Sequence, residues 1–236
     1  MVRWFWQRKP QRRPLALRTR GDLGDATRVD FAELAPELSR FLGQAAYLQL
    51  GYFETLSRGI RGTPELATKE SLARAAGTAL DKHRDIVALI TERGEDPTEL
   101  MLPFRENLDA FRRKTIGARP EETLLAVYLT SGMLDDFYLA LASSYGETGA
   151  KVVEILRAEG GRHEIVGIIQ AAIESDPEWR SLLSMWGRRL VGDTLLVCRG
   201  ALRPERLADA DTRIEPVYTE LMGAHARRMD AMGLAS

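Results

Sequence analysis

The sequence is poor in the residues that most often mark a chemical site. It has a single cysteine, Cys198, and three histidines in 236 residues. One cysteine excludes an intrachain disulfide and is typical of a protein in a reducing compartment. No apolar run approaches the roughly 18 residues of a membrane span, and the N-terminus lacks the apolar segment of a signal peptide. We therefore expect a cytoplasmic protein that is not transmembrane.

Several catalytic motifs are also missing. The chain has no glycine-rich phosphate loop, no Cys-x-x-Cys pair and no Gly-x-Ser-x-Gly. Its net charge is −1, so no overall field favours binding to nucleic acid or to a membrane.

The charge is unevenly distributed along the chain. The first twenty residues carry seven arginines or lysines and no acid. We predict that residues 1–28 form a basic, disordered tail that improves solubility, because this composition cannot build a core. The alternative is a contact arm for tRNA phosphates or an anionic lipid surface. The contact residues would then be Arg8, Lys9, Arg12 and Arg13.

What the chain does have is helical periodicity. Apolar residues recur at three and four positions, which predicts helices over about 30–58, 64–93, 105–114, 120–145, 148–174, 177–201 and 212–232. Pro64 suits a first helical turn, and Gly94 suits a left-handed C-cap. Gly160 and Gly161 together cost on the order of 2 kcal/mol relative to alanine, so we predict a kink or break there.

These helices predict an all-α fold with one domain over residues 29–236. Long antiparallel helices with short connections form a bundle. The stretch between the second and third long helices is longer than the other connections and contains the short helix at 105–114. It can therefore serve as a long crossover between two parallel helices of the bundle.

Some polar residues fall on faces that are otherwise apolar. His83, Asp136, Glu159 and His163 are the candidates for a site that binds one divalent metal ion. The alternative is a hydrogen-bonded polar network. A buried acid needs a partner, so Asp136 predicts a positive neighbour, for which Lys82 and Arg162 are candidates besides a metal or a histidine. Two-iron bundles normally use Glu-x-x-His pairs, and no such pair occurs here.

Four segments carry a resemblance to a known family. They are Gly94–Pro97, Leu134–Tyr138, Trp186–Asp193 and Ala224–Met229. With them, residues from about 30 to 233 resemble actinobacterial ferritin-like proteins, in the branch similar to the tRNA isopentenyladenosine hydroxylase. The resemblance implies a ferritin-like four-helix bundle with extra C-terminal helices. Active hydroxylases of this type use two non-haem irons and dioxygen.

The resemblance also implies where the iron ligands of such a protein would fall. The glutamate of the first helix corresponds to Gln49, and the Glu-x-x-His of the second corresponds to Ala79 and Lys82. The acid of the third helix corresponds to Asp136, with Asp135 as the less favoured choice. We expect Lys82 to replace the charge of a metal and to pair with Asp136 or Glu159.

From these substitutions we predict a degenerate di-iron site without a cofactor, in a non-catalytic protein with a binding or interaction role. The alternative is a di-iron hydroxylase related to the tRNA-modifying enzymes, with iron or a single divalent metal as cofactor. A homodimer is a further expectation, because bundles of this kind expose apolar flanks.

Overall fold

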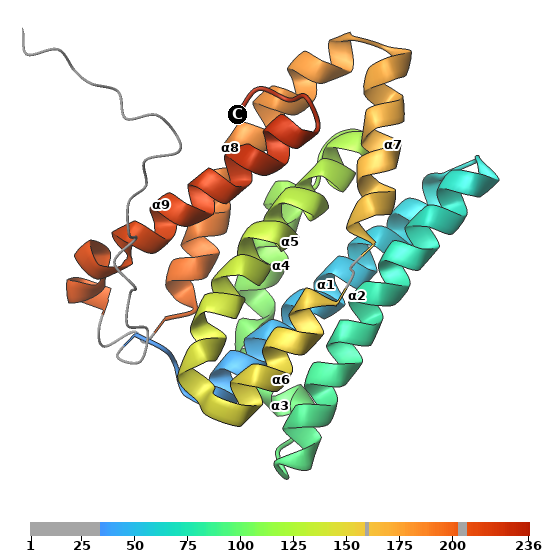
Figure 1. Cartoon of the computed structure of the whole chain (residues 1–236). Helices are drawn as coiled ribbons and strands as arrows, with labels where there is room; N and C mark the ends of the chain where they lie inside the picture. Colours follow the sequence, from blue (N-terminus) through green and yellow to red (C-terminus); the bar gives the residue numbers. More distant parts are fainter. Residues whose placement is uncertain (1–33, 159–160, 203–206) are drawn as a thin grey trace, which may run out of the picture.

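The computed structural model describes residues 34–158, 161–202 and 207–236, and their side chains except at 207–213. Within these ranges every regular element is a helix (Figure 1), which confirms the predicted all-α class. The long helices are α1 (Leu38–Gly62), α2 (Leu66–Glu92), α5 (Pro120–Ala142), α6 (Gly146–Arg157), α7 (Arg162–Ser175), α8 (Glu178–Gly200) and α9 (Leu207–Ala231). The predicted tail lies outside the described residues.

The first two helices form an antiparallel pair. α1 begins at Leu38, eight residues after the predicted start, because Pro36 disfavours helical backbone at the residue before it. α2 ends at Glu92, with Arg93 as its C-cap. Gly94 follows with a left-handed φ of 76°, and its N–H donates to the carbonyl oxygen of Thr91 at 2.9 Å. This is the left-handed glycine that the sequence predicts at the end of the helix.

The crossover from α2 to α5 is folded rather than extended. It contains α3 (Pro97–Met101), η2 (Leu102–Phe104) and α4 (Arg105–Thr115), of which only the last is predicted from the sequence. Asp96 caps α3 by accepting from the backbone N–H groups of Thr98 and Glu99. α4 is attached to α1 by Arg112, which bonds Glu54 at 2.5 Å and also pairs with Asp109.

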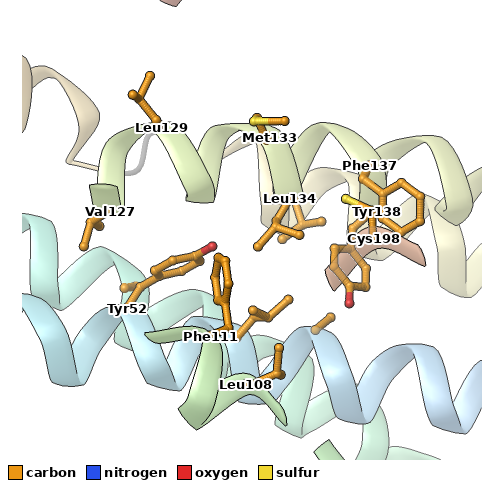
Figure 2. Close-up of a cluster of buried hydrophobic side chains, with 14 of the residues drawn as sticks. Tyr52, Leu108, Phe111, Val127, Leu129, Met133, Leu134, Phe137, Tyr138 and Cys198 are labelled. Carbon is orange, nitrogen blue, oxygen red and sulfur yellow. The ribbon is translucent and has the colours of Figure 1, made fainter. Parts of the chain in front are cut away.

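α5 is the central helix. It lies between the α1–α2 pair and the α8–α9 pair (Figure 1), and 15 of its residues are buried. Figure 2 shows part of the core that it forms, in which Tyr52 of α1, Phe111 of α4 and Cys198 of α8 pack against its apolar side chains. The predicted ferritin-like arrangement is therefore present, with α1, α2, α5 and the α6–α7 line as the bundle and α8 and α9 as additions.

Among the described residues, one stretch is apolar enough to cross a membrane by length and composition alone. It runs over Pro120–Ser175 and begins with α5, and 72% of its most apolar 18 residues are buried inside the bundle. Asp135 and Asp136 interrupt the apolar run of α5, so the expectation that no unbroken run reaches membrane length is not contradicted. Burial explains the composition of α5, because a helix packed on all sides needs apolar residues on all sides.

Candidate functional site

Four polar residues meet within the bundle, and we refer to Gln49, Lys82, Asp135 and Arg162 as the core cluster. The first three are buried, and the side chain of Arg162 is 37% exposed. Asp135 of α5 is 4% exposed, and its Oδ1 accepts a hydrogen bond from Nε2 of Gln49 on α1 at 3.1 Å. Its Oδ2 lies 3.6 Å from Nζ of Lys82 on α2 and 2.6 Å from Nη2 of Arg162 on α7. One carboxylate therefore joins four helices.

Lys82 is held at the centre by a second contact. Its Nζ donates to the carbonyl oxygen of Leu156 at 2.7 Å, and the residue is 4% exposed. Leu156 lies in the last turn of α6, where carbonyl groups have no partner in the helix and the dipole is negative. The ammonium therefore satisfies both a helix end and a buried acid.

The break between α6 and α7 delivers Arg162 to this place. Gly161 has a left-handed φ of 65°, and a Cβ added to it would lie 2.3 Å from Cα of Ala75 on α2. Only glycine meets both conditions. Because the chain crosses α2 this closely, Arg162 begins α7 within reach of Asp135. The predicted break is confirmed at Gly161, and Gly160 lies outside the described residues.

Burial dominates the electrostatics of the core cluster. It raises the pKa of the Asp135 carboxyl, and the charges of Lys82 and Arg162 oppose this shift. Burial also raises the pKa of Tyr52, which is 7% exposed. In both groups, burial favours the protonated, uncharged form.

The space around the core cluster is small. A cavity of about 30 Å³ is lined by members of the cluster together with Tyr52, Ala79 and Ser131. A cavity needs roughly 10–15 Å³ for one water molecule, so about two waters fit. The positions that the resemblance implies as replaced ligands, Gln49, Ala79 and Lys82, all line this cavity.

The prediction that Asp136 is the central acid is wrong. Asp136 faces away from the cluster, with a side chain 33% exposed, and pairs with Nη2 of Arg228 on α9 at 2.6 Å. Adjacent helix positions differ by about 100°, so Asp135 and Asp136 cannot face one site. Lys82 and Arg162, expected as partners of Asp136, pair with Asp135 instead.

Arg228 was not predicted as a partner from the sequence. A Cβ added to Gly132 of α5 would lie 2.5 Å from its Nε, so the glycine leaves room for the guanidinium. Nη1 of Arg228 is buried without a partner in the described part of the chain. The nearby His225 is 4% exposed, and burial, followed by the charge of Arg228, lowers its pKa to about 4. In the sequence, only Gly132, a glycine inside an apolar helix, indicated that another side chain packs closely there.

The three candidate metal ligands that the structure describes do not gather as predicted. His83 is half-buried, with Nδ1 2.9 Å from the carbonyl oxygen of Ala46, and His163 is exposed on α7. Asp136 is bonded to Arg228, and Glu159 lies outside the described residues. Among described residues, no group of three His, Cys, Asp or Glu could hold a metal ion. Arg8, Lys9, Arg12 and Arg13, the predicted contact residues, also lie outside them.

The donors of the core cluster do not suit a pair of iron ions. A protonated lysine is a donor only and cannot coordinate a metal. Oδ1 of Asp135 already accepts a hydrogen bond from Gln49. Its Oδ2 accepts one from Arg162 and forms an ion pair with Lys82. A cation entering this place would meet two positive side chains, so the residues present do not fit a di-iron centre.

Comparison with known families agrees with this architecture. Residues 35–208 match the family model described as a ferritin-like domain of actinomycetes. The chain belongs to this family. Comparison with curated proteins gives no match. The family description names a fold and a group of bacteria and no activity, so the tRNA hydroxylase-like branch stays a prediction for this ferritin-like chain.

Proposed function

We propose that this ferritin-like protein is a non-catalytic binding or interaction protein, in which a lysine-centred ion pair stands where related bundles hold two irons. The observation that carries the proposal is the position of Lys82. Its ammonium lies between the carbonyl oxygen of Leu156 and the carboxylate of Asp135. A fixed positive charge there has the effect that a metal has in an active bundle, because it compensates a buried carboxylate.

The identity of the other residues supports the same conclusion. Gln49 offers an amide where a two-iron bundle uses a carboxylate, and Ala79 offers no donor atom. Gln49 donates to Asp135, which is the role of a structural network rather than of a ligand. A hydrogen-bonded cluster that joins four helices stabilises a unique packing of the bundle when every member is satisfied.

The first test is the metal content of protein produced with iron supplied in the growth medium. We expect substoichiometric iron by elemental analysis, with the same value for the natural chain and for Asp135→Asn. Near-stoichiometric iron in the natural chain that is lost in Asp135→Asn contradicts the proposal. That outcome favours the alternative of a di-iron hydroxylase.

A folding control accompanies this test. Asp135→Asn keeps the shape of the side chain and its ability to accept from Gln49, but it removes the charge that balances Lys82. The comparison is therefore made at a temperature where the helical circular dichroism of both proteins matches. If the two proteins are equally folded, a difference in their iron content reports metal coordination and not loss of structure.

A further inference from the structure

An apolar cleft lies at the end of the bundle where α1 turns into α2. Its volume is about 420 Å³, within the range of roughly 300–1,000 Å³ that small-molecule sites occupy. Its walls come from the last turns of α1, the start of α2, the loop at 116–119, the start of α5 and Ile168 of α7. We refer to it as the end cleft.

The deep part of the end cleft is made of buried side chains. Leu56, Leu72, Leu124 and Val127 all line it, and their exposures are 3%, 1%, 6% and 6%. Leu56 and Val127 also line the small cavity around the core cluster. The end cleft therefore runs from the surface toward the centre of the bundle, and its inner part offers only apolar contact.

The hydroxyl groups of the lining are already used within the chain. Thr55 and Thr63 each donate to the backbone carbonyl four residues earlier. Thr68 donates to Glu65, and Thr123 donates to the carbonyl oxygen of Arg119. A ligand therefore meets no free hydroxyl proton from the threonines that line the cleft.

Two arginines supply the remaining charge-assisted donors. Arg58 and Arg119 line the end cleft, both are exposed, and neither side chain makes an ion pair with a described residue. Arg119 is positioned by stacking on the Trp179 ring, with its Cζ 5.1 Å from the ring centroid. The lining carries one carboxylate, Glu121, so positive charge is in excess at the mouth.

The wall beside Arg119 is preformed. The backbone N–H of Gly117 donates to Oγ1 of Thr123 at 3.1 Å, and that of Arg119 donates to Oε2 of Glu122 at 3.1 Å. A Cβ added to Gly117 would lie 2.2 Å from Cβ of Glu122, so the loop packs closely against α5. A rigid wall lowers the entropy lost when a ligand binds.

We propose that the end cleft binds a single-chain fatty carboxylate, with the acyl chain against the buried leucines and the carboxylate at Arg58 and Arg119. A guanidinium matches a carboxylate in geometry and charge, and the apolar interior offers nothing to a polar tail. This inference rests on the proposed binding role and names the class of its ligand.

The test uses dodecanoate with metal-free full-length protein, below the aggregation concentration of the ligand, by isothermal titration calorimetry. We expect saturable binding to the natural chain. Gly59→Leu should weaken it by roughly tenfold or more, because Gly59 lines the cleft and an added Cβ meets nothing closer than Leu72 at 3.8 Å. The Cβ is therefore accommodated without a clash, and the rest of the leucine side chain reduces the space left for a ligand.

Gly77→Leu is the matched control. Gly77 is an interior residue of α2 with nothing within 4 Å of an added Cβ, and it does not line the end cleft. Both variants gain the helix propensity of leucine over glycine, but only Gly59→Leu occupies the cleft. No dodecanoate binding to the natural chain, or equal binding by Gly59→Leu and Gly77→Leu, overturns the proposal.

A second set of variants tests whether the two arginines bind the carboxylate of the ligand. The double variant Arg58→Gln, Arg119→Gln should weaken dodecanoate binding by roughly tenfold and leave dodecanol binding unchanged. Arg61→Gln, Arg113→Gln removes the same net charge at exposed residues outside the cleft and should leave both unchanged. Dodecanol binding as tightly as dodecanoate to the natural chain overturns the assignment. A failure here leaves iron content unaffected, so it is distinguishable from a failure of the proposed function.

Discussion

Asp135 and Asp136 are adjacent on α5 and carry the same group, but they face different halves of the bundle. Asp135 is enclosed by α1, α2 and α7 and has three partners. Asp136 is 33% exposed and pairs with Arg228 of α9. The difference teaches that a rotation of about 100°, one residue along a helix, decides whether an acid faces the core cluster or the contact with an added helix.

The largest effect should come from removing the enclosed acid. Asp135→Ala leaves the buried Lys82 without its carboxylate, and losing one partner of a buried ion pair costs about 3–5 kcal/mol. Asp136→Ala removes a partly exposed pair and should cost about 1 kcal/mol. Urea unfolding followed by circular dichroism measures both, and equal losses would contradict the distinction between the two acids.

The contact between α5 and α9, where Asp136 pairs with Arg228, should respond to pH through the nearby His225. His225 has an ordinary pKa of 6.5 that is lowered to about 4 in the folded chain, so below pH 6.5 the unfolded chain binds a proton that the folded chain does not. Stability therefore falls as pH falls from 6.5 to 4, by roughly 3 kcal/mol for this residue.

The measurement for His225 is a comparison of two proteins rather than one curve, because carboxylates also titrate in this range. Between pH 7 and pH 4, His225→Phe should lose roughly 3 kcal/mol less of its free energy of unfolding than the natural chain does. Parallel curves for the two proteins would show that the imidazole is not desolvated in the fold.

A smaller effect should come from the glycine that faces Arg228. In Gly132→Ala the new Cβ would lie 2.5 Å from Nε of Arg228, so the guanidinium must move away from Asp136. We expect a loss of about 1–3 kcal/mol, as for overpacking in a core. Gly167→Ala is the control, because an added Cβ meets nothing within 4 Å, and it should stabilise α7 by about 0.5–1 kcal/mol. A stabilising Gly132→Ala would refute this packing.

The smallest effect is expected one residue away from Arg228. Arg227 pairs with Glu220, and their side chains are 62% and 57% exposed. Arg227→Ala should therefore change the free energy of unfolding by no more than about 0.5 kcal/mol, in the same denaturation experiment. A loss as large as that of Arg228→Ala would mean that exposure does not separate these two arginines.

The helices could be predicted from the sequence because their signals are local. The apolar period, Pro120 and Gly94 each act within one or two turns, and the observed helices follow them. α3 was missed because five residues are too few to show a period. The observed start of α1 lies later than the apolar period indicates, because Pro36 disfavours helical backbone at the residue before it.

The candidate site was harder to predict, and α5 is the reason. A helix that is apolar on every side has no phase from which to tell which residue faces which neighbour. Asp135 and Asp136 could therefore be exchanged by a rotation of 100° that changes nothing in the apolar pattern. Gln49 and Lys82 lie on amphipathic helices, and the resemblance indicated both positions. The apolar phase of α2 instead indicated His83 as the core residue, and His83 is only half-buried. The pairing of Arg228 with α5 depends on tertiary packing that no local pattern records.

The position of Lys82 has a consequence for how such a protein can change. Replacing this lysine alone with a metal ligand removes the ammonium that balances Asp135 and frees the carbonyl oxygen of Leu156. A single substitution of Lys82 therefore lowers the stability of the bundle, and a second substitution at Asp135 would be needed to restore the balance of charge. The two positions are coupled, so neither is free to vary alone.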